Sequence, residues 1–300
     1  METIALIGLG RIAKNYTAGI AASHRFSLCA VCDLSLAAIS EREYAAYRHY
    51  TDYRELVARE HPDWLLIATP PKTHFEIAAY ALSHGVNVLV EKPATVTIEE
   101  YLTLCALARE HGRIFDVMFH WQWGSEVPPL RTLVNSGKLS EIAIEICDPY
   151  STDGERIDPD RVGLCGAWLD SGVNALSLVK CFLPLDTYQI LAVRTQKCKA
   201  SGLPLFVAAE LEIDGVRVFI SVDWREQKNP KCSRLLLDGR CIAVDHMART
   251  VSDGVHTAQY GQGERLLEHY LNLFEHAEIA GAGEDALRIH QILFEVVAHL

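Results

Sequence analysis

A glycine motif near the N-terminus has the residue types and the spacing of a phosphate-binding turn. The sequence Gly-Leu-Gly-Arg-Ile-Ala runs from Gly8 to Ala13 and directly follows the apolar run Thr3–Ile7. The first glycine permits a tight turn, the second lets the backbone approach a pyrophosphate, and the small alanine permits close helix–strand packing. The helix that follows would offer its free N–H groups to the phosphates. The motif predicts dinucleotide binding, although the same glycines could serve a strand–helix turn alone.

An acidic residue lies where a bound dinucleotide would place a ribose. Asp33 ends the second apolar run, Ser27–Cys32, and follows Gly10 by 23 residues. A carboxylate at this position accepts hydrogen bonds from ribose hydroxyls and repels a 2′-phosphate. We therefore predict NAD as the cofactor, and the neighbouring Leu34 and Ser35 leave NADP as an alternative.

The segment Glu91–Pro93 follows the fourth apolar run, Val86–Val90. The carboxyl ends of parallel strands form the edge at which such folds bind their ligands. Lys92 at that edge could donate to a substrate oxygen or relay its proton, because partial burial moves the pKa of a lysine toward neutrality. The alternative is a lysine that extends into solvent from the strand end.

Two polar residues in the stretch Gly166–Asn174 have helical spacing. In a helix, Asp170 and Asn174 would share one face that is otherwise apolar. Buried polar groups need partners, and a bound polyol would supply them. Alternatively, Asp170 caps a helix that begins at Ser171.

The elements that would position these residues alternate in the first part of the chain. Five apolar runs predict strands, at Thr3–Ile7, Ser27–Cys32, Trp64–Ala68, Val86–Val90 and Ile114–Met118. Helical patterns separate them. Runs that are apolar on both faces and joined by helices predict a doubly wound parallel sheet over residues 1–118.

Beyond residue 118 the pattern changes. Four stretches of strand character follow one another between residues 188 and 244, broken by turn signals such as Asp214-Gly215. A strand is also expected at 141–147, and helices are expected near 127–136, 168–182, 264–280 and 285–299. Consecutive strands without helices predict an antiparallel sheet, so we expect residues 119–300 to form a second, α+β domain.

Composition limits the partners and the location. The formal net charge is −11, and so acidic a surface repels phosphate backbones and anionic lipid; we expect no nucleic-acid or membrane partner. The chain enters a strand at once, with no basic leader and no apolar run near twenty residues, which favours a cytoplasmic protein. Of nine cysteines, Cys29 and Cys32 have metal-type spacing but lack a second pair nearby, so we expect no metal.

The order of these motifs, together with Ala-Thr-Pro-Pro-x-x-His at Ala68–His74, resembles the Gfo/Idh/MocA family of oxidoreductases. The resemblance covers essentially the full chain. It implies a Rossmann domain followed by an α+β domain whose open, mainly antiparallel sheet forms homo-oligomers. It also implies that Lys92 lies beside the nicotinamide and the substrate, and that Asp170 is the acidic residue of the site. The cofactor contacts that it implies are Gly8, Gly10, Arg11, Ile12, Asp33, Thr69, Pro70, His74, Glu91 and Lys92.

One departure from the family pattern concerns proton transfer. Most members have histidine four residues after the acidic residue, where this chain has Asn174. An amide cannot take a proton at neutral pH, so that role would pass to Lys92 or Asp170, with Asn174 orienting the substrate. Asn174, Val173 and the run Ala175–Ser177 resemble the aldose 1-dehydrogenase branch, which oxidises the anomeric carbon of sugars such as L-arabinose and D-galactose to a lactone.

The expected activity is hydride transfer between NAD and a hydroxyl-bearing carbon of a sugar or polyol, with Lys92, Asp170 and Asn174 as the catalytic residues. The alternatives are reduction of a C=N or C=O bond in a biosynthetic intermediate and a non-enzymatic dinucleotide sensor. Further substrate contacts are expected from residues that follow predicted strands: His120, Trp121, Trp123 and Asp148. Packing between domains, or a solvated loop in the case of Asp148, is the alternative for these residues.

Overall fold

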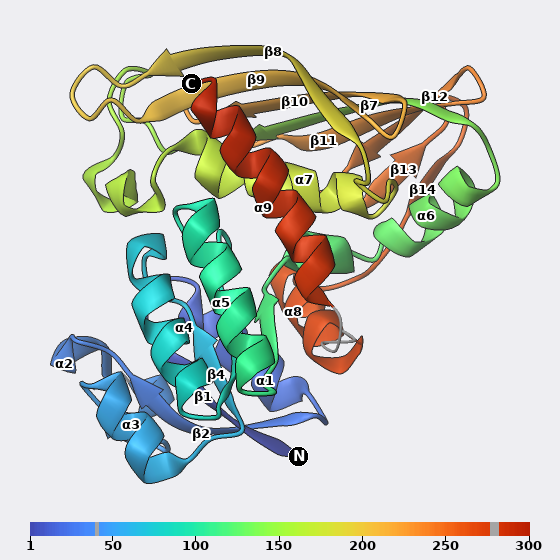
Figure 1. Ribbon diagram of the computed structural model, residues 1–300. Helices are drawn as coiled ribbons and strands as arrows, with labels where there is room; N and C mark the ends of the chain where they lie inside the picture. The colour runs from blue at the N-terminus through green and yellow to red at the C-terminus, as the bar shows by residue number, and fades with distance from the viewer. Residues whose placement is uncertain (40–41, 277–281) are drawn as a thin grey trace. The chain divides into compact units, whose positions relative to one another are not determined.

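The computed structural model describes residues 1–39, 42–276 and 282–300, which form two compact units (Figure 1). The first unit contains Met1–His120 and Leu266–Leu287, and the second contains Trp121–Arg265 and Arg288–Leu300. Within the described ranges, no helix is both long and apolar enough to cross a membrane.

The first unit is built on a six-stranded parallel sheet; the parallel sheet is confirmed, and its short edge strand Arg48–Tyr50 is additional to the five predicted strands. The sheet has the strand order β3-β2-β1-β4-β5-β6. The strands β2 and β3 are therefore added on one side of β1, and β4, β5 and β6 are added on the other, so the strand order reverses between β1 and β4. Open α/β sheets bind their ligands outside the carboxyl ends of the strands at such a reversal. The strands are β1 (Glu2–Ile7), β2 (Phe26–Cys32), β3 (Arg48–Tyr50), β4 (Trp64–Ile67), β5 (Asn87–Val90) and β6 (Phe115–Val117).

Helices connect these strands, as the alternating pattern predicts. They are α1 (Ala13–Ala22), α2 (Leu36–Ile39), α3 (Tyr53–Glu60), α4 (His74–Ser83) and α5 (Ile98–Glu110). The central strands β1 and β4 are buried on both faces, which explains their continuous apolar runs. Part of the helix predicted after the second strand, at residues 40 and 41, lies outside the described residues.

Helix α8 (Arg265–His276) adds to the first unit, whereas the sequence assigns all of 119–300 to the second domain. Gly19 of α1 explains this packing, because a Cβ atom there would lie 3.1 Å from Tyr270 Cβ and 3.2 Å from the ring of Phe274. The rings of Tyr16 and Tyr270 also pack with centroids 4.6 Å apart. The last residues of the predicted helix 264–280 lie outside the described residues.

The second unit is built on an eight-stranded sheet with the order β14-β13-β12-β11-β7-β10-β9-β8. Among the described strands, β7 and β10 pair in parallel and every other pair is antiparallel, so the predicted mainly antiparallel sheet is confirmed. The strands are β7 (Leu139–Cys147), β8 (Tyr188–Lys197), β9 (Pro204–Ile213), β10 (Val216–Asp223), β11 (Lys231–Leu237), β12 (Arg240–Asp245), β13 (Thr250–Ser252) and β14 (Thr257–Gln259).

One face of this sheet is apolar and covered by helices. Alternate residues of β9 and β10 are buried, in keeping with the period of two in a strand. Helix α7 (Val173–Lys180) and the C-terminal part of α9 (Ala282–Ala298) lie over that face (Figure 1). The indole N–H of Trp168 donates to the carbonyl of Leu293 at 2.9 Å and so fixes α9 to this unit. Helix α6 (Val127–Asn135) packs against the far strands of the sheet.

Candidate active site

The glycine turn after β1 has the geometry of a phosphate cradle. Gly8 has φ +93°, and a Cβ atom there would lie 2.8 Å from the carbonyl carbon and oxygen of Ala68, so the position requires glycine. A Cβ atom at Gly10, in contrast, would lie more than 4 Å from every described residue other than its chain neighbours. Helix α1 begins at Ala13 without a side-chain cap or an acidic residue in its first turn. The uncapped helix start and the open backbone at Gly10 fit a bound pyrophosphate.

Asp33 joins the end of β2 to this turn. One carboxylate oxygen accepts a hydrogen bond from the N–H of Leu9 at 2.7 Å, and the other accepts from the N–H of Ser35 at 2.7 Å. The side chain is half-buried, and the residue that follows, Leu34, is 92% exposed. Carboxylate oxygens have further lone pairs, so Asp33 can accept from ribose hydroxyls while it holds the turn.

His74 holds two loops of the first unit together. Its side chain is fully buried, with Nδ1 3.0 Å from the carbonyl oxygen of Pro93 and Nε2 2.7 Å from that of Thr69. Burial lowers the pKa of His74, because the charged ring loses its solvation. His74 thus contacts the loop that contains Thr69 and Pro70 and the segment after Lys92, and its predicted cofactor contact stays a prediction.

Glu91 and Lys92 follow β5, and a buried tyrosine supports them. The hydroxyl of Tyr16, in α1, donates to Glu91, and the other carboxylate oxygen of Glu91 accepts from the backbone N–H of Lys92 at 2.8 Å. Burial, reinforced by the charge of Glu91, raises the pKa of Tyr16, which therefore stays protonated as a donor. The Lys92–Pro93 peptide is cis. Sequence reasoning missed Tyr16, because nothing in the sequence links α1 to a residue 75 positions away.

The residues after β6 are mostly packed. His120 is 7% exposed, with its Nδ1 3.2 Å from that of His269 and its ring 5.1 Å from the ring of Tyr270. Trp121 is 3% exposed and contacts His246 edge to face, with ring centroids 5.6 Å apart. These contacts lie within one unit in each case, the first for His120 and the second for Trp121, and the predicted substrate contacts of both residues stay predictions. Trp123 is half-buried, which leaves its predicted substrate contact as a proposal.

A π-helical turn, Trp168–Gly172, carries the polar residues of the second unit; the sequence predicts one continuous helix over 168–182. Gly172 makes the turn feasible, because a Cβ atom there would lie 2.7 Å from the indole ring of Trp168. Asp170 and Asn174 are both buried, and the Asn174 amide donates to the backbone carbonyl of Asp170 at 3.3 Å. Within the described part of the chain, the Asn174 Oδ1 atom is buried and has no hydrogen-bond donor.

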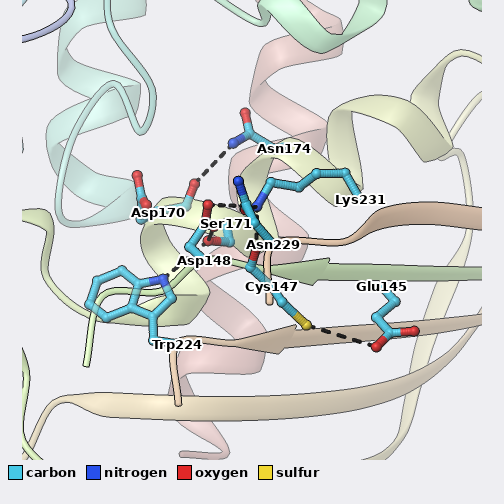
Figure 2. A network of polar contacts seen from close by, with 9 residues as sticks. All are labelled: Glu145, Cys147, Asp148, Asp170, Ser171, Asn174, Trp224, Asn229 and Lys231. Carbon is cyan, nitrogen blue, oxygen red and sulfur yellow. Dashed lines mark hydrogen bonds and ion pairs between the residues drawn. The ribbon is translucent and has the colours of Figure 1, made fainter. Parts of the chain in front are cut away.

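A solvated loop carboxylate is the alternative for Asp148, but its side chain is largely buried and is paired with Lys231. Figure 2 shows that Asp148, at the end of β7, lies between Lys231 and the π turn. One carboxylate oxygen is 2.6 Å from Lys231 Nζ, and the other accepts from the Ser171 hydroxyl at 2.7 Å. Trp224 Nε1 in turn donates to the oxygen of Ser171 at 3.3 Å. Sequence reasoning missed Lys231, which lies 83 residues away from Asp148.

A buried Ser–His–Glu arrangement lies elsewhere in the second unit. Ser233 Oγ is 2.7 Å from His246 Nε2, and His246 Nδ1 is 2.8 Å from Glu126 Oε1. The spacing is that of a hydrolase triad, but all three side chains are at least 97% buried. A substrate could not reach the serine, so these contacts tie α6 to β11 and β12.

The two sets of site residues belong to different units. The glycine turn, Asp33, Glu91 and Lys92 belong to the first, and Asp148, Asp170, Asn174 and Lys231 belong to the second. Among the described residues, no group of three or more His, Cys, Asp or Glu side chains could hold a metal ion.

The glycine turn, Asp33 and the parallel sheet are features of a dinucleotide-binding Rossmann fold, and the comparisons with known proteins agree. Residues 3–119 match the model described as "Oxidoreductase family, NAD-binding Rossmann fold", which is that of Gfo/Idh/MocA proteins. This part of the chain is therefore similar to the NAD-binding Rossmann domain of that family.

Among curated relatives, the D-glucoside 3-dehydrogenase of Escherichia coli strain K12 is 30% identical over 144 residues, which are 47% of this chain and 41% of the relative. The chain thus aligns with about two fifths of the length of the first relatives that it matches.

Solved structures match over nearly the whole chain. One is KijD10, a 3-ketoreductase from Actinomadura kijaniata in complex with NADP, with a TM-score of 0.83, 18% identity and coverage of 99% of this chain and 97% of the other. Another is GenD2 from gentamicin A biosynthesis in complex with NAD, with a TM-score of 0.82, 18% identity and coverage of 98% and 92%. At this identity the likeness establishes the fold of both units.

Proposed function

We propose that this protein transfers a hydride between a nicotinamide dinucleotide and a hydroxyl- or carbonyl-bearing carbon of a sugar-like substrate. The observation that carries the proposal is the glycine turn, in which Gly8 is required by its contacts and Gly10 is open to a ligand. A sugar-like substrate is supported by the relatives, which include a D-glucoside 3-dehydrogenase and a dTDP-sugar 3-reductase from Streptomyces antibioticus.

The roles of the residues follow from their chemistry. The bound nicotinamide would supply the hydride acceptor or donor at its C4 atom. Lys92 would accept the hydroxyl proton during oxidation and return it during reduction. Asn174 would orient the substrate, since its buried Oδ1 atom can accept a hydrogen bond from a hydroxyl. Asp170 would hold the reacting hydroxyl by the same kind of contact.

The position of oxidation separates two versions of this proposal. The segment 173–177 resembles aldose 1-dehydrogenases, which supports oxidation at the anomeric carbon to a lactone. The names of the relatives and of the solved neighbours point to C3 of a sugar and include reductases. Reduction of a ketone is thus the second candidate, and the same residues would serve it by microscopic reversibility.

The test is a substrate panel measured in both directions. Wild-type protein would be mixed with NAD or NADP and with aldoses, glucosides and inositols, and separately with NADH or NADPH and 3-keto sugars. We expect a cofactor-linked absorbance change with one sugar series. A protein that binds NAD but reacts with no member of the panel would favour the dinucleotide sensor.

We also propose a homo-oligomer through the outer face of the second sheet. That face is lined by small and polar residues of neighbouring strands, among them Ala143, Ala208, Ser221, Glu210 and Arg234. Small side chains allow a second sheet to approach closely, and charges of both signs permit pairing across a two-fold axis. Light scattering after size exclusion would decide this, with Ala208→Arg expected to give monomers and a single monomeric wild-type peak contradicting it.

A further inference from the structure

Lys231 is a buried lysine of the second unit that the expected chemistry does not use. It is 5% exposed at the start of β11. Its Nζ donates to the backbone carbonyl of Cys147, to Asp148 Oδ1 at 2.6 Å and to Asn229 Oδ1 at 2.7 Å. An ammonium group has three N–H bonds, so all three are used, and Lys231 cannot donate to a substrate without losing one of them.

Two carboxylates lie near the ammonium group of Lys231. Burial lowers the pKa of Lys231, while the carboxylates of Asp148 and Asp170 oppose that shift. By geometry, the ammonium contacts Asp148 directly, and Asp148 in turn contacts Ser171, the residue next to Asp170 on the π turn.

The contact chain ends at the turn that carries Asp170. The carboxylate of Asp148, held on one side by Lys231, accepts from Ser171 on the other (Figure 2). Ser171 is fully buried and adjacent to Asp170, and its oxygen accepts from Trp224. The two hydrogen bonds of Ser171 hold the turn, since a π turn lacks the regular hydrogen bonds of an α-helix.

We propose that Lys231 is a positioning residue for Asp170: it holds Asp148 against the π turn and balances the charges of the two carboxylates. The inference rests on the proposed function of Asp170 as a substrate contact. Lys231 would thus be a charged group that supports the cluster of Asp170 and Asn174. Asn174 lies at the position where the family pattern has a histidine.

The variants are chosen to separate charge from packing. Lys231→Met removes the ammonium and leaves Asp148 buried without its partner. Lys231→Met combined with Asp148→Asn removes both charges, and the amide of the new side chain can still accept from Ser171. Replacing a buried ion pair as a whole is often tolerated, whereas removing one partner is costly. Lys199→Met, an exposed lysine of the same unit, is the control, and Lys231→Gln replaces Lys231→Met if that variant does not fold.

Two readouts test the inference. The first is hydrogen exchange by mass spectrometry on peptides that cover 168–174, which we expect to be at least about tenfold faster in Lys231→Met and near wild type in the double variant. The second is the pH profile of kcat/KM on the substrate that the panel identifies. We expect its acidic limb to move up by about one pH unit in Lys231→Met, because an uncompensated carboxylate retains its proton to higher pH, and to return in the double variant.

Besides Asp148 and Asp170, the described charged and titratable groups around this cluster include Glu145, Cys147, Arg161, Asp223 and Arg225. Arg225 pairs with Asp223 at 2.6 Å, so this pair is balanced independently of Lys231. Unchanged exchange at 168–174 in a folded Lys231→Met variant, or an unmoved acidic limb, would overturn the inference. A wild-type protein without turnover would instead count against the proposed function, and the exchange data would still decide the role of Lys231.

Discussion

The backbone around Lys92 is held on both sides by hydrogen bonds. The backbone N–H of Lys92 is held by Glu91, which Tyr16 supports, and the carbonyl of the following Pro93 is held by the buried His74. A substitution that changes only the end of the Lys92 side chain should therefore leave this framework intact.

Replacing Lys92 with methionine should lower kcat by roughly two to four decades, because general acid–base help is lost. NAD affinity, measured by calorimetry, should change little. Lys72→Met, at an exposed lysine of the same unit, is the control and should retain full turnover. Equal turnover in Lys92→Met and wild type would show that Lys92 does not handle the proton.

Asp33 should set the preference between NAD and NADP. Replacing it with serine removes a charged acceptor from the ribose and should weaken NAD binding by about tenfold to a hundredfold, as expected for a hydrogen bond to a charged group. NADP binding should weaken less or improve, because the repulsion of the 2′-phosphate is removed. Calorimetry with both nucleotides would check this, and an unchanged NAD:NADP ratio would argue against ribose contact.

Among the elements, the glycine turn between β1 and α1 offers a matched pair of substitutions. A methyl group at Gly8 meets the backbone of Ala68, whereas one at Gly10 has no other described residue within 4 Å beyond its chain neighbours. Gly8→Ala should therefore lower the free energy of unfolding by about 1–3 kcal/mol, through overpacking and through its positive φ.

Gly10→Ala should leave the free energy of unfolding within about 0.5 kcal/mol of wild type, as for a substitution without contacts. It should nevertheless weaken NAD binding, because the methyl group projects where the pyrophosphate would approach the backbone. Urea unfolding and calorimetry on the same two variants would check both effects. Normal NAD affinity in Gly10→Ala would mean that the phosphates bind elsewhere.

For the whole molecule, the burial of His74 makes acid stability a testable property. Burial holds the pKa of His74 below its ordinary value, so protonation favours the unfolded chain. The contribution of this ring is fully present above about pH 6.5 and is lost as the pH falls through and below that value.

The free energy of unfolding of the wild type should therefore fall between about pH 7 and pH 5, by up to about 1.4 kcal/mol per pH unit from this residue. His74→Asn should be less stable at pH 7.5 but should lose less on acidification. Urea unfolding followed by circular dichroism at several pH values would measure the two slopes. Parallel slopes would exclude His74 as a source of the acid sensitivity.

The sequence predicts those parts of the molecule that depend on local patterns. Strands buried on both faces appear as continuous apolar runs, and Gly8 appears in the motif that its backbone conformation requires. The sequence does not distinguish the π turn from an α-helix, because one extra residue in a turn leaves the apolar pattern of the helix nearly unchanged. Lys231 with Asp148, Tyr16 with Glu91, and the packing of α8 on α1 join residues that are far apart in sequence, and no local pattern reports such pairs.

The most direct measurement is the absorbance of the reduced nicotinamide when wild-type protein, NAD and the sugar panel are combined, with Gly10→Ala and Lys92→Met in parallel. A signal with one sugar series that is strongly reduced in both variants is the predicted result. Confirmed NAD binding without turnover of any sugar in either direction would contradict a sugar oxidoreductase. Turnover that survives both substitutions would contradict the assigned site.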